Sequence, residues 1–413
     1  MNLEGARVAV AGMARSGAAA AELLESKGAR VIRVDQRPSA GVRPQAEESF
    51  RDAGLIVLSP GVPADLAEIQ PARARGVPVI GDLELASWFL QGEIIGITGS
   101  NGKTTTTALT AHILKSSGIP VQVGGNIGTP PCSMVKASRP GQWNVLELSS
   151  FQLETIDHFR AHIGALLNIT PDHLDRHYSL ERYAAAKGRL FENQTADDFA
   201  VLNAADGLAR AFAERARAQV EWFSADQPGA AAIREILPLR GRHNLENAMA
   251  AAAVARLAGA GQEQILAAIQ TFPGVEHRLE FVCERGGVAW YNDSKATNID
   301  ATLKALDAFP GGLWVILGGK DKNSDYTPLA APLKEKACAA LLIGAAAEKI
   351  AAQLDGSVKI LHCGTLDAAV REARSRARKG DTVLLTPACA SFDQFENFEH
   401  RGREFKRLAK EGA

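Results

Sequence analysis

The segment GITGSNGKTTTT, residues 96–107, is the feature that most constrains the fold of this chain. It places Gly-Lys-Thr between an apolar run and a helix-like stretch, an order typical of a strand, a phosphate-binding turn and a helix. Its glycine spacing departs from G-x-x-x-x-G-K-[ST], being shorter when counted from Gly99 and longer from Gly96. Backbone N–H groups still face phosphate in such a turn, with Lys103 on the β- and γ-phosphates and Thr104 on Mg²⁺. The segment predicts a nucleotide site formed by Gly99, Ser100, Asn101, Gly102, Lys103, Thr104 and Thr105.

Short β-branched apolar runs alternate with alanine-rich stretches along the whole chain. This alternation is typical of βαβ units and a mainly parallel sheet. A chain of 413 residues is too long for one hydrophobic core, and there are too many expected strands for one sheet. Breaks in the pattern near residues 88–92 and 272–276 predict boundaries that give the segments 1–90, 91–275 and 276–413.

The composition narrows the functional classes. Hydrophobic residues make up 46% of the chain and charged residues 23%, as in a soluble globular protein, and the net charge is −1. This charge gives no electrostatic reason to expect nucleic acid or a membrane as a partner. The five cysteines never form a C-x-x-C pair, which argues against a disulfide framework or a zinc site. We expect a cytoplasmic protein.

A second glycine-rich turn, Gly12-Met-Ala-Arg-Ser-Gly17, follows the first apolar run, and Asp35 ends the next one. The pattern is close to the dinucleotide fingerprint, but Ala14 replaces the second glycine, where a pyrophosphate needs the closest backbone approach. A full NAD site is therefore not expected. Two interpretations remain: a helix-capping turn without a ligand, or a smaller phosphate-bearing ligand at the helix N-terminus.

Possible ligand groups follow the central apolar runs. Glu147 ends one run, and TPDHLDRH, residues 170–177, follows the next with His173 inside it. Each residue alone is more often a helix cap or a solvated charge, but together, in a P-loop domain, they favour metal and phosphate chemistry. Lys187 has no role that spacing reveals, and a surface lysine is the default expectation.

Polar segments also mark the last third of the chain. Asn244 and Asn247 open an alanine-rich stretch, and a helix cap explains only one of them. The segments 277–278, 292–298 and 318–322 stand at the ends of expected strands, where α/β domains bind ligands.

Several segments together resemble the Mur ligases: GITGSNGKTTTT, ELSSFQLE, TPDHLDRH, GRHNLENAMAA, YNDSKATN and TPACASFDQFENFEHRG. The P-loop and HNxxN segments are shared with folylpolyglutamate synthase, whereas SSFQLE, NDSKATN and ACASFDQF are similar to the D-glutamate-adding member. The resemblance implies an α/β fold with three domains: a Rossmann-like N-terminal domain, a central P-loop ATPase-type domain with a mainly parallel sheet, and a C-terminal Rossmann-like domain. A domain for a uridine-linked substrate then explains why about ninety residues precede the P-loop.

The resemblance also implies a reaction. In this family ATP phosphorylates the substrate carboxylate, and an amino acid attacks the acyl phosphate. The D-glutamate-adding member uses UDP-N-acetylmuramoyl-L-alanine, D-glutamate, ATP and Mg²⁺ in peptidoglycan precursor synthesis. We expect a monomer with these small-molecule partners.

Site residues carry over by position in the matching segments. The UDP-substrate set is Ser16, Asp35, Gln36, Arg37, Ser59, Gly61 and Asn126. The ATP set adds to the loop residues Asn244, Asn247, Arg278, Asp293 and Lys295. The D-glutamate set is Thr297, Lys322, Ser391 and Phe398. Lys103, Glu147, His173 and Lys187 are implied to be catalytic, and the implied metal-binding set is Thr104, Glu147, His173 and Lys187, the last as a carbamate.

Besides another member of the Mur ligases, three alternatives stay open at this point. Folylpolyglutamate synthase would lack the N-terminal substrate domain that the first ninety residues suggest. A P-loop nucleotide switch without synthetic chemistry would not need the polar segments after the P-loop. An NAD-dependent dehydrogenase is weakened by Ala14 and by the second nucleotide loop.

Overall fold

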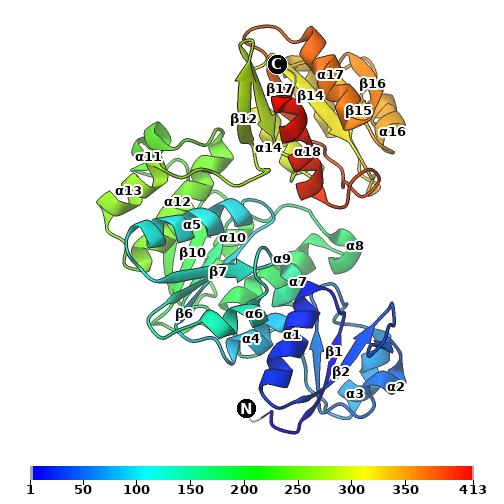
Figure 1. Cartoon of the computed structure of the whole chain (residues 1–413). Helices are drawn as coiled ribbons and strands as arrows, with labels where there is room; N and C mark the ends of the chain where they lie inside the picture. The colour runs from blue at the N-terminus through cyan, green and yellow to red at the C-terminus, as the bar shows by residue number, and fades with distance from the viewer. Residues whose placement is uncertain (1–2, 412–413) are drawn as a thin grey trace. The chain divides into compact units, whose positions relative to one another are not determined.

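The structure is a computed structural model that describes residues 3–411. It forms two compact units: unit 1 comprises Met1–Ile236 with Glu246–Phe272, and unit 2 comprises Leu237–Leu245 with Pro273–Ala413. Two β-sheets lie in unit 1 and one in unit 2 (Figure 1). The domain boundaries at residues 90 and 275 stay a prediction.

The first sheet of unit 1 is parallel throughout, with the strand order β3-β2-β1-β4-β5. Apart from the exposed Arg7 at the start of β1, its central strands β1 and β4 are apolar and buried, as in a parallel sheet covered on both faces. The strands are β1 (Arg7–Ala11), β2 (Arg30–Asp35), β3 (Arg43–Pro44), β4 (Leu55–Leu58) and β5 (Val79–Gly81). The helices are α1 (Arg15–Ser26), α2 (Glu47–Phe50), η1 (Ala67–Ile69), α3 (Gln70–Ala74) and α4 (Asp82–Ser87).

The second sheet is also parallel, with the order β11-β10-β9-β6-β8-β7. Strand β6 lies between β9 and β8, so the P-loop that follows β6 has neighbours on both sides. The strands are β6 (Glu93–Thr98), β7 (Val121–Gly125), β8 (Trp143–Glu147), β9 (Ile163–Leu166), β10 (Phe199–Asn203) and β11 (Gln219–Phe223).

Helices accompany this sheet in the order α5 to α13. They are α5 (Lys103–Ser116), α6 (Pro131–Met134), η2 (Val135–Ala137), α7 (Ser150–Leu153), α8 (Leu174–His177), α9 (Leu180–Gly188), η3 (Arg189–Phe191), α10 (Gly207–Ala213), α11 (Ala230–Ile236), α12 (Arg242–Leu257) and α13 (Gln262–Gln270). An apolar core that includes Leu146, Leu166 and Phe191 fixes the sheet against several of these helices.

The sheet of unit 2 has the order β12-β13-β17-β14-β15-β16, in which only the β12–β13 pair is antiparallel. The strands are β12 (Glu280–Arg285), β13 (Val288–Asn292), β14 (Leu313–Gly318), β15 (Ala337–Ile343), β16 (Ile360–Gly364) and β17 (Thr382–Leu385). The helices are α14 (Ile299–Asp307), η4 (Thr327–Leu329), α15 (Ala330–Lys336), α16 (Ala347–Gln353), α17 (Leu366–Arg376) and α18 (Phe398–Lys410).

The predicted fold class is confirmed, because the strands form mainly parallel sheets with helices between them. Parallel sheets bind ligands beyond the carboxyl ends of their strands. Within residues 3–411, no helix combines the length and the apolar character needed to cross a bilayer.

Candidate active site

The P-loop occupies the turn between β6 and α5. Gly102 has a φ of 86° and is the residue before α5, and Gly99 has a φ of 154°, so both take a backbone conformation that favours glycine. The Lys103 ammonium donates to the carbonyls of Gly99 at 2.8 Å and Ser100 at 2.9 Å. The lysine therefore folds back over its own loop, at the N-terminus of a helix whose amides favour an anion.

The loop after β9 is fastened to the P-loop. The Ser100 hydroxyl donates to the Thr170 carbonyl at 2.9 Å, and the Asn101 amide donates to the Asn168 side chain at 2.9 Å. These bonds join residues about seventy positions apart in the chain. They explain how the segment 170–177, which contains His173, is brought beside the nucleotide loop.

Lys187 is buried, contrary to the default expectation of a surface lysine. It lies on α9 with 1% of its surface exposed, and its ammonium donates to the Gly99 carbonyl at 2.9 Å. The same carbonyl accepts from Lys103. Burial, and secondarily the charge of Lys103, holds the pKa of Lys187 well below its usual value. The spacing of residues gave no sign of this position, because the contact depends on the packing of α9 against the P-loop.

Glu147 is a buried carboxylate at the end of β8, beside the P-loop strand. Its register partner on β6 is Ile97, and only 2% of its surface is exposed. One carboxylate oxygen accepts from the Asn126 side chain at 3.0 Å, while the other is buried and has no partner among the described residues. A free, buried carboxylate oxygen is a fitting ligand for a hard cation such as Mg²⁺.

The two histidines of the segment 170–177 differ. His177 is 3% exposed, contacts the Ser150 hydroxyl at 2.9 Å and Glu154 at 3.1 Å, and has a pKa lowered chiefly by burial. The His173 side chain is 48% exposed, lies at a φ of 53° and packs edge-on against Phe151. Among residues 3–411, no three His, Cys, Asp or Glu side chains gather in a group suited to hold a metal. The predicted metal role of His173 therefore stays a prediction.

Helix α12 brings Asn247 against the P-loop. A Cβ added at Gly102 would lie 2.1 Å from the Asn247 side-chain oxygen, so glycine is required there by contact as well as by conformation. Asn244 lies on the same helix but within unit 2, and its side-chain amide donates to the Arg240 carbonyl at 2.7 Å. Both asparagines lie inside α12, which begins at Arg242, so the expectation that one of them caps this helix is wrong.

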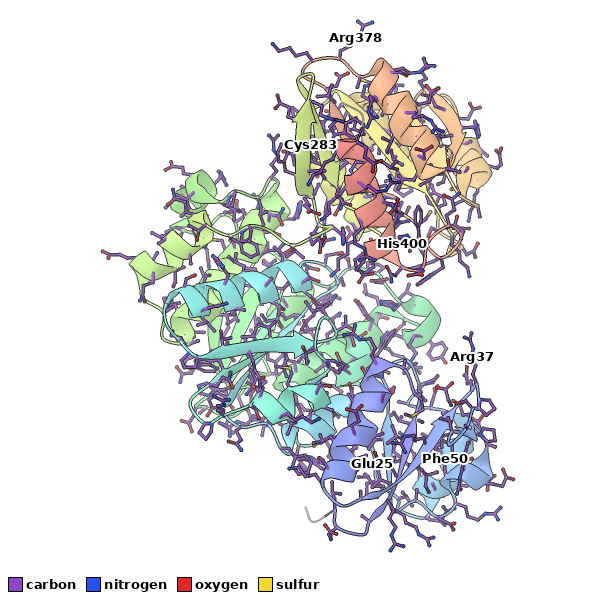
Figure 2. All side chains as sticks on the ribbon, in the orientation of Figure 1. Glu25, Arg37, Phe50, Cys283, Arg378 and His400 are labelled. Atoms are coloured by element: carbon purple, nitrogen blue, oxygen red, sulfur yellow. The ribbon has the colours of Figure 1, made fainter. Side chains whose placement is uncertain are left out.

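A cavity of about 420 Å³ opens beside the first glycine turn. Five residues of the predicted UDP-substrate set line it together with Asn126: Ser16, Asp35, Gln36, Ser59 and Gly61. Arg37 is the one member of the set that does not line the cavity, and it is exposed on the loop after β2 (Figure 2).

Asp35 closes the glycine turn. Its carboxylate accepts from the Met13 amide at 2.6 Å and the Arg37 amide at 2.9 Å, and these bonds, the Met13 bond first, lower its pKa. The Ser59 hydroxyl donates to the Gly12 carbonyl at 2.5 Å and holds β4 to the same turn. A carboxylate at the mouth of a helix N-terminus suits a ligand that carries hydrogen-bond donors beside its anionic group.

Some cavity residues were missed by the sequence interpretation. Arg15, Gln45 and Gln152 line the cavity but were not predicted. Gln152 lies in the quoted segment ELSSFQLE and also forms a capping box with Ser149, a signal that spacing alone assigns to helix structure. Arg15 sits inside the glycine turn, so its position was available from the fingerprint.

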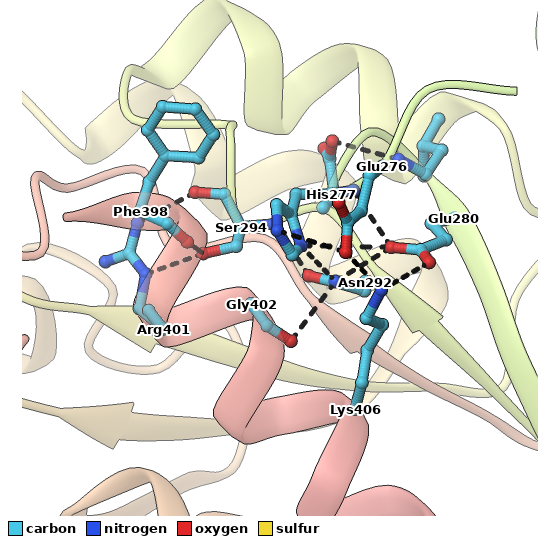
Figure 3. Close-up of polar contacts among 11 residues, drawn as sticks. Glu276, His277, Glu280, Asn292, Ser294, Phe398, Arg401, Gly402 and Lys406 are labelled. Atoms are coloured by element: carbon cyan, nitrogen blue, oxygen red, sulfur yellow. Dashed lines mark hydrogen bonds and ion pairs between the residues drawn. The ribbon is translucent and has the colours of Figure 1, made fainter.

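In unit 2, the start of α18 is tied to the segment 292–298 (Figure 3). The Ser294 hydroxyl donates to the Phe398 carbonyl at 2.8 Å. The guanidinium of the buried Arg401 donates both to the hydroxyl and to the backbone carbonyl of Ser294. The Lys295 ammonium lies 5.6 Å from the centre of the Phe398 ring. The structure thus brings together two residues that were predicted for different ligands, ATP and D-glutamate.

The other predicted residues of unit 2 differ in burial. Asp293 is 1% exposed, accepts from the Leu279 amide at 3.1 Å, and has a pKa that burial raises to about 7. Ser391 is buried, whereas Lys322 is exposed. Arg278, predicted for ATP, forms an isolated β-bridge with Val275. Thr297, predicted for D-glutamate, lies within the segment 292–298.

Known proteins match this chain over its whole length. The Mur ligase middle domain model matches residues 97–236, and the Mur ligase, glutamate ligase domain model matches residues 277–389. A UDP-N-acetylmuramoylalanine–D-glutamate ligase of Solibacter usitatus is 57% identical, covering 99% of this chain and 98% of that protein. The ligase of the same name from Koribacter versatilis is 48% identical, covering 100% of this chain and 99% of that protein.

Solved structures agree on the fold. The MurF ligase of Thermotoga maritima in complex with ADP is similar with a TM-score of 0.66 at 17% identity, covering 99% of this chain and 96% of that one. The UDP-N-acetylmuramate–alanine ligase MurC of the same organism is similar with a TM-score of 0.62 at 19% identity, covering 97% and 98%. The chain therefore belongs to the Mur ligase family, and within it to the UDP-N-acetylmuramoylalanine–D-glutamate ligases.

Proposed function

We propose that this chain joins D-glutamate to UDP-N-acetylmuramoyl-L-alanine, with cleavage of ATP to ADP and phosphate, in peptidoglycan precursor synthesis. The names of its full-length relatives support the two substrates. The observation that carries the chemistry is the P-loop with Lys103, flanked by the buried Glu147 on the next strand and by the buried Lys187. The protein is proposed to act as a monomer.

The proposed reaction has two steps. An oxygen of the alanine carboxylate attacks the γ-phosphorus of ATP, the bond to the β-phosphate oxygen breaks, and ADP leaves. The amine of D-glutamate then attacks the carbonyl carbon of the acyl phosphate, and the tetrahedral intermediate collapses with loss of phosphate and of the amine proton. Lys103 would neutralise the charge on the phosphoryl group during transfer, which is the main requirement of such chemistry.

The first glycine turn would hold the UDP moiety. Its cavity of about 420 Å³ is lined by Ser16, Asp35 and Asn126, among others. Asn126 also bonds to Glu147, which supports a position for the substrate carboxylate near the P-loop. The α1 N-terminus provides amides for the diphosphate.

Mg²⁺ is proposed to be held by the unpartnered oxygen of Glu147, the Thr104 hydroxyl, His173 and a modified Lys187. When bound, the ion supplies positive charge to the phosphates during transfer. Lys187 favours carbamylation because CO₂ reacts only with a neutral amine, and this amine has a depressed pKa. As a carbamate it becomes an anion with two oxygen ligands and no longer repels Lys103.

The residues of unit 2 complete the proposal. Arg278, Asp293 and Lys295, with Asn244 and Asn247 of α12, are proposed to contact ATP. Thr297, Lys322, Ser391 and Phe398 are proposed to bind D-glutamate, whose two carboxylates suit a lysine and two hydroxyls.

The test is phosphate release from ATP in the presence of UDP-N-acetylmuramoyl-L-alanine and one amino acid at a time. We expect release to require both the uridine-linked acceptor and D-glutamate, with L-glutamate a poor substitute. Equal turnover with L-glutamate or L-lysine would refute D-glutamate as the specific substrate, although the chain would still be a ligase. Release from ATP without an acceptor would contradict synthetic chemistry altogether.

A further inference from the structure

Asp82 is a buried carboxylate that the reaction described above does not use. It is the first residue of α4 and is 1% exposed. Neither of its carboxylate oxygens has a hydrogen-bond partner of ordinary geometry among the described residues. A buried acid without a partner costs stability, and replacing it with a neutral group of similar shape is often neutral or stabilising.

The neighbours of this carboxylate face the substrate cavity. Helix α4 packs against α1, which carries Ser16, and against α7, which carries Gln152. Burial raises the pKa of Asp82 to about 6, and hydrogen bonding by the Leu83 amide and by the side chains of Ser16 and Gln152 acts in the opposite direction. Ser16 and Gln152 both line the cavity beside the first glycine turn, whereas Asp82 does not. Asp82 therefore lies next to two residues that line the cavity, without lining it itself.

Gln152 has an unsatisfied donor of its own. Its side-chain oxygen accepts from the Ser149 amide at 3.2 Å, but its side-chain nitrogen is buried and has no partner among residues 3–411. An amide nitrogen carries two N–H donors, so it can serve a carboxylate and a ligand at once. An unpartnered acceptor and an unpartnered donor thus lie next to each other at the wall of the cavity.

A purely structural explanation fits less well. An acid in the first turn of a helix complements the helix dipole when it is near the surface, by about 0.3–1 kcal/mol. Asp82 is instead fully buried beside the apolar packing of α4, and the titratable group against it, the Cys132 thiol, is buried with a pKa raised chiefly by its own burial. Because the carboxylate of Asp82 is buried, its desolvation costs more than its interaction with the dipole of the short helix α4 returns.

We propose that Asp82 is a positioning residue for the diphosphate of the UDP substrate. Its carboxylate accepts from the Ser16 hydroxyl and from one N–H of Gln152 when the cavity is occupied. The second N–H of Gln152 and the amides at the start of α1 are then held toward the phosphate oxygens. The proposal rests on the proposed function, because it names how the same cavity binds its ligand.

The test is Asp82→Asn, which keeps the shape of the side chain and removes the charge. We expect the KM for UDP-N-acetylmuramoyl-L-alanine to rise about 5- to 10-fold, with kcat and the KM values for ATP and D-glutamate unchanged. Calorimetry should show the same loss of affinity for the UDP substrate alone. A residue that only supported the fold would change all three KM values together or none of them.

Thermal unfolding gives a second readout, in which Asp82→Asn should gain stability although it loses affinity for the substrate. The pKa of Asp82 in the folded protein, about 6, is above its ordinary value of 3.8, so its contribution to stability is present below pH 4 and is lost as the pH rises through 6. Asp82→Asn should therefore unfold at a higher temperature than the wild type at pH 8, and the difference should shrink toward pH 4. A lower melting temperature at pH 8 would indicate a structural role and overturn the proposal.

The matched control is Cys132→Ala. Its thiol donates to the Asp82 carbonyl at 3.3 Å, so this change disturbs the same packing without touching the carboxylate. We expect the KM for the UDP substrate to stay at the wild-type value. A rise equal to that of Asp82→Asn would attribute the effect to packing and would count against the proposal.

A double-mutant cycle tests the route. If Asp82 acts partly through Gln152, Asp82→Asn should raise the KM by a smaller factor in a Gln152→Leu background than in the wild type, because only the contact with Ser16 is then left to lose. Independent, additive effects would contradict the proposed contact. If the wild type does not use UDP-N-acetylmuramoyl-L-alanine at all, the proposed function is wrong. If the wild type is active and Asp82→Asn has the same KM for this substrate, only the inference about Asp82 is wrong.

Discussion

The two glycine-rich turns of unit 1 share a local design and differ in the charges placed around them. Both follow a buried strand of a parallel sheet and precede a helix. Gly12 and Gly102 have nearly the same φ, 84° and 86°, and neither α1 nor α5 has a side-chain cap at its first residue. Each turn therefore leaves amides at a helix N-terminus for an anion.

The charged groups that contact the backbone of the two turns differ. The carboxylate of Asp35 closes the first turn by accepting from the Met13 amide, while the ammonium groups of Lys103 and Lys187 both point at the Gly99 carbonyl of the second. A turn with a carboxylate suits a ligand that carries hydrogen-bond donors beside its phosphates, and a turn with two lysines suits a triphosphate. The turn thus supplies the shape of an anion site, while residues from other elements decide which ligand it accepts.

The largest expected effect concerns the charge of the second turn. Lys103→Ala should lower kcat by about 10³-fold, since a positioned group that stabilises the developing charge contributes a few kcal/mol to the transition state. Phosphate release measures it. Lys115→Ala, an exposed lysine in the last turn of the same helix, is the control and should keep wild-type turnover. Near-normal turnover of Lys103→Ala would show that the loop is not catalytic.

The second lysine of this turn should show a smaller loss that can be repaired. Lys187→Ala should reduce turnover by about 10²-fold, in the range found for groups that support a metal site, and a short carboxylic acid should restore part of it. The same acid should not activate Lys103→Ala. Carbon-13 NMR of the wild type under labelled CO₂ should show a carbamate carbon that is absent from the variant. Ordinary turnover of Lys187→Ala would refute the modification.

The glycines allow each turn to be disturbed separately. A Cβ at Gly102 would lie 2.1 Å from Asn247, and one at Gly12 would lie 2.7 Å from Val62, in addition to about 1–2 kcal/mol of strain for alanine at positive φ. Gly102→Ala should raise the KM for ATP about 10-fold, and Gly12→Ala should raise the KM for the UDP substrate by a similar factor.

The control for backbone strain is Gly118→Ala. Gly118 has a φ of 74°, and an added Cβ would meet nothing within 4 Å, so only stability should fall. If either turn variant changed the KM of the other turn's substrate equally, the two turns would not be separate sites.

The sequence predicts the turns better than their surroundings. Gly102, Lys103 and the acid at the end of β8 are visible because local spacing between a strand and a helix determines them. The α/β class is visible for the same reason, since each βαβ unit is read over a few dozen residues.

Lys187 and Asp82 were not visible in this way. The first is buried because α9 packs under the P-loop from eighty-eight positions away, and the second because α4 packs behind Ser16 and Gln152. Burial and the absence of partners are properties of long-range packing, which no local pattern records. The resemblance to the Mur ligases pointed to Lys187, but only the structure shows the burial that lowers its pKa.

The smallest expected effect concerns the Ser16 hydroxyl at the first turn. Ser16→Ala removes a hydroxyl from the wall of the cavity and leaves the amides of α1 in place. One lost hydrogen bond contributes about 0.5–1.5 kcal/mol, so the KM for the UDP substrate should rise about 5-fold with kcat unchanged. Initial rates at saturating ATP and D-glutamate measure it. A ground-state contact changes binding alone, because the first turn lies outside the phosphoryl transfer that Lys103 serves. A loss in kcat without a change in KM would place Ser16 in the chemistry of the second turn, and the division of work between the two turns would then be wrong.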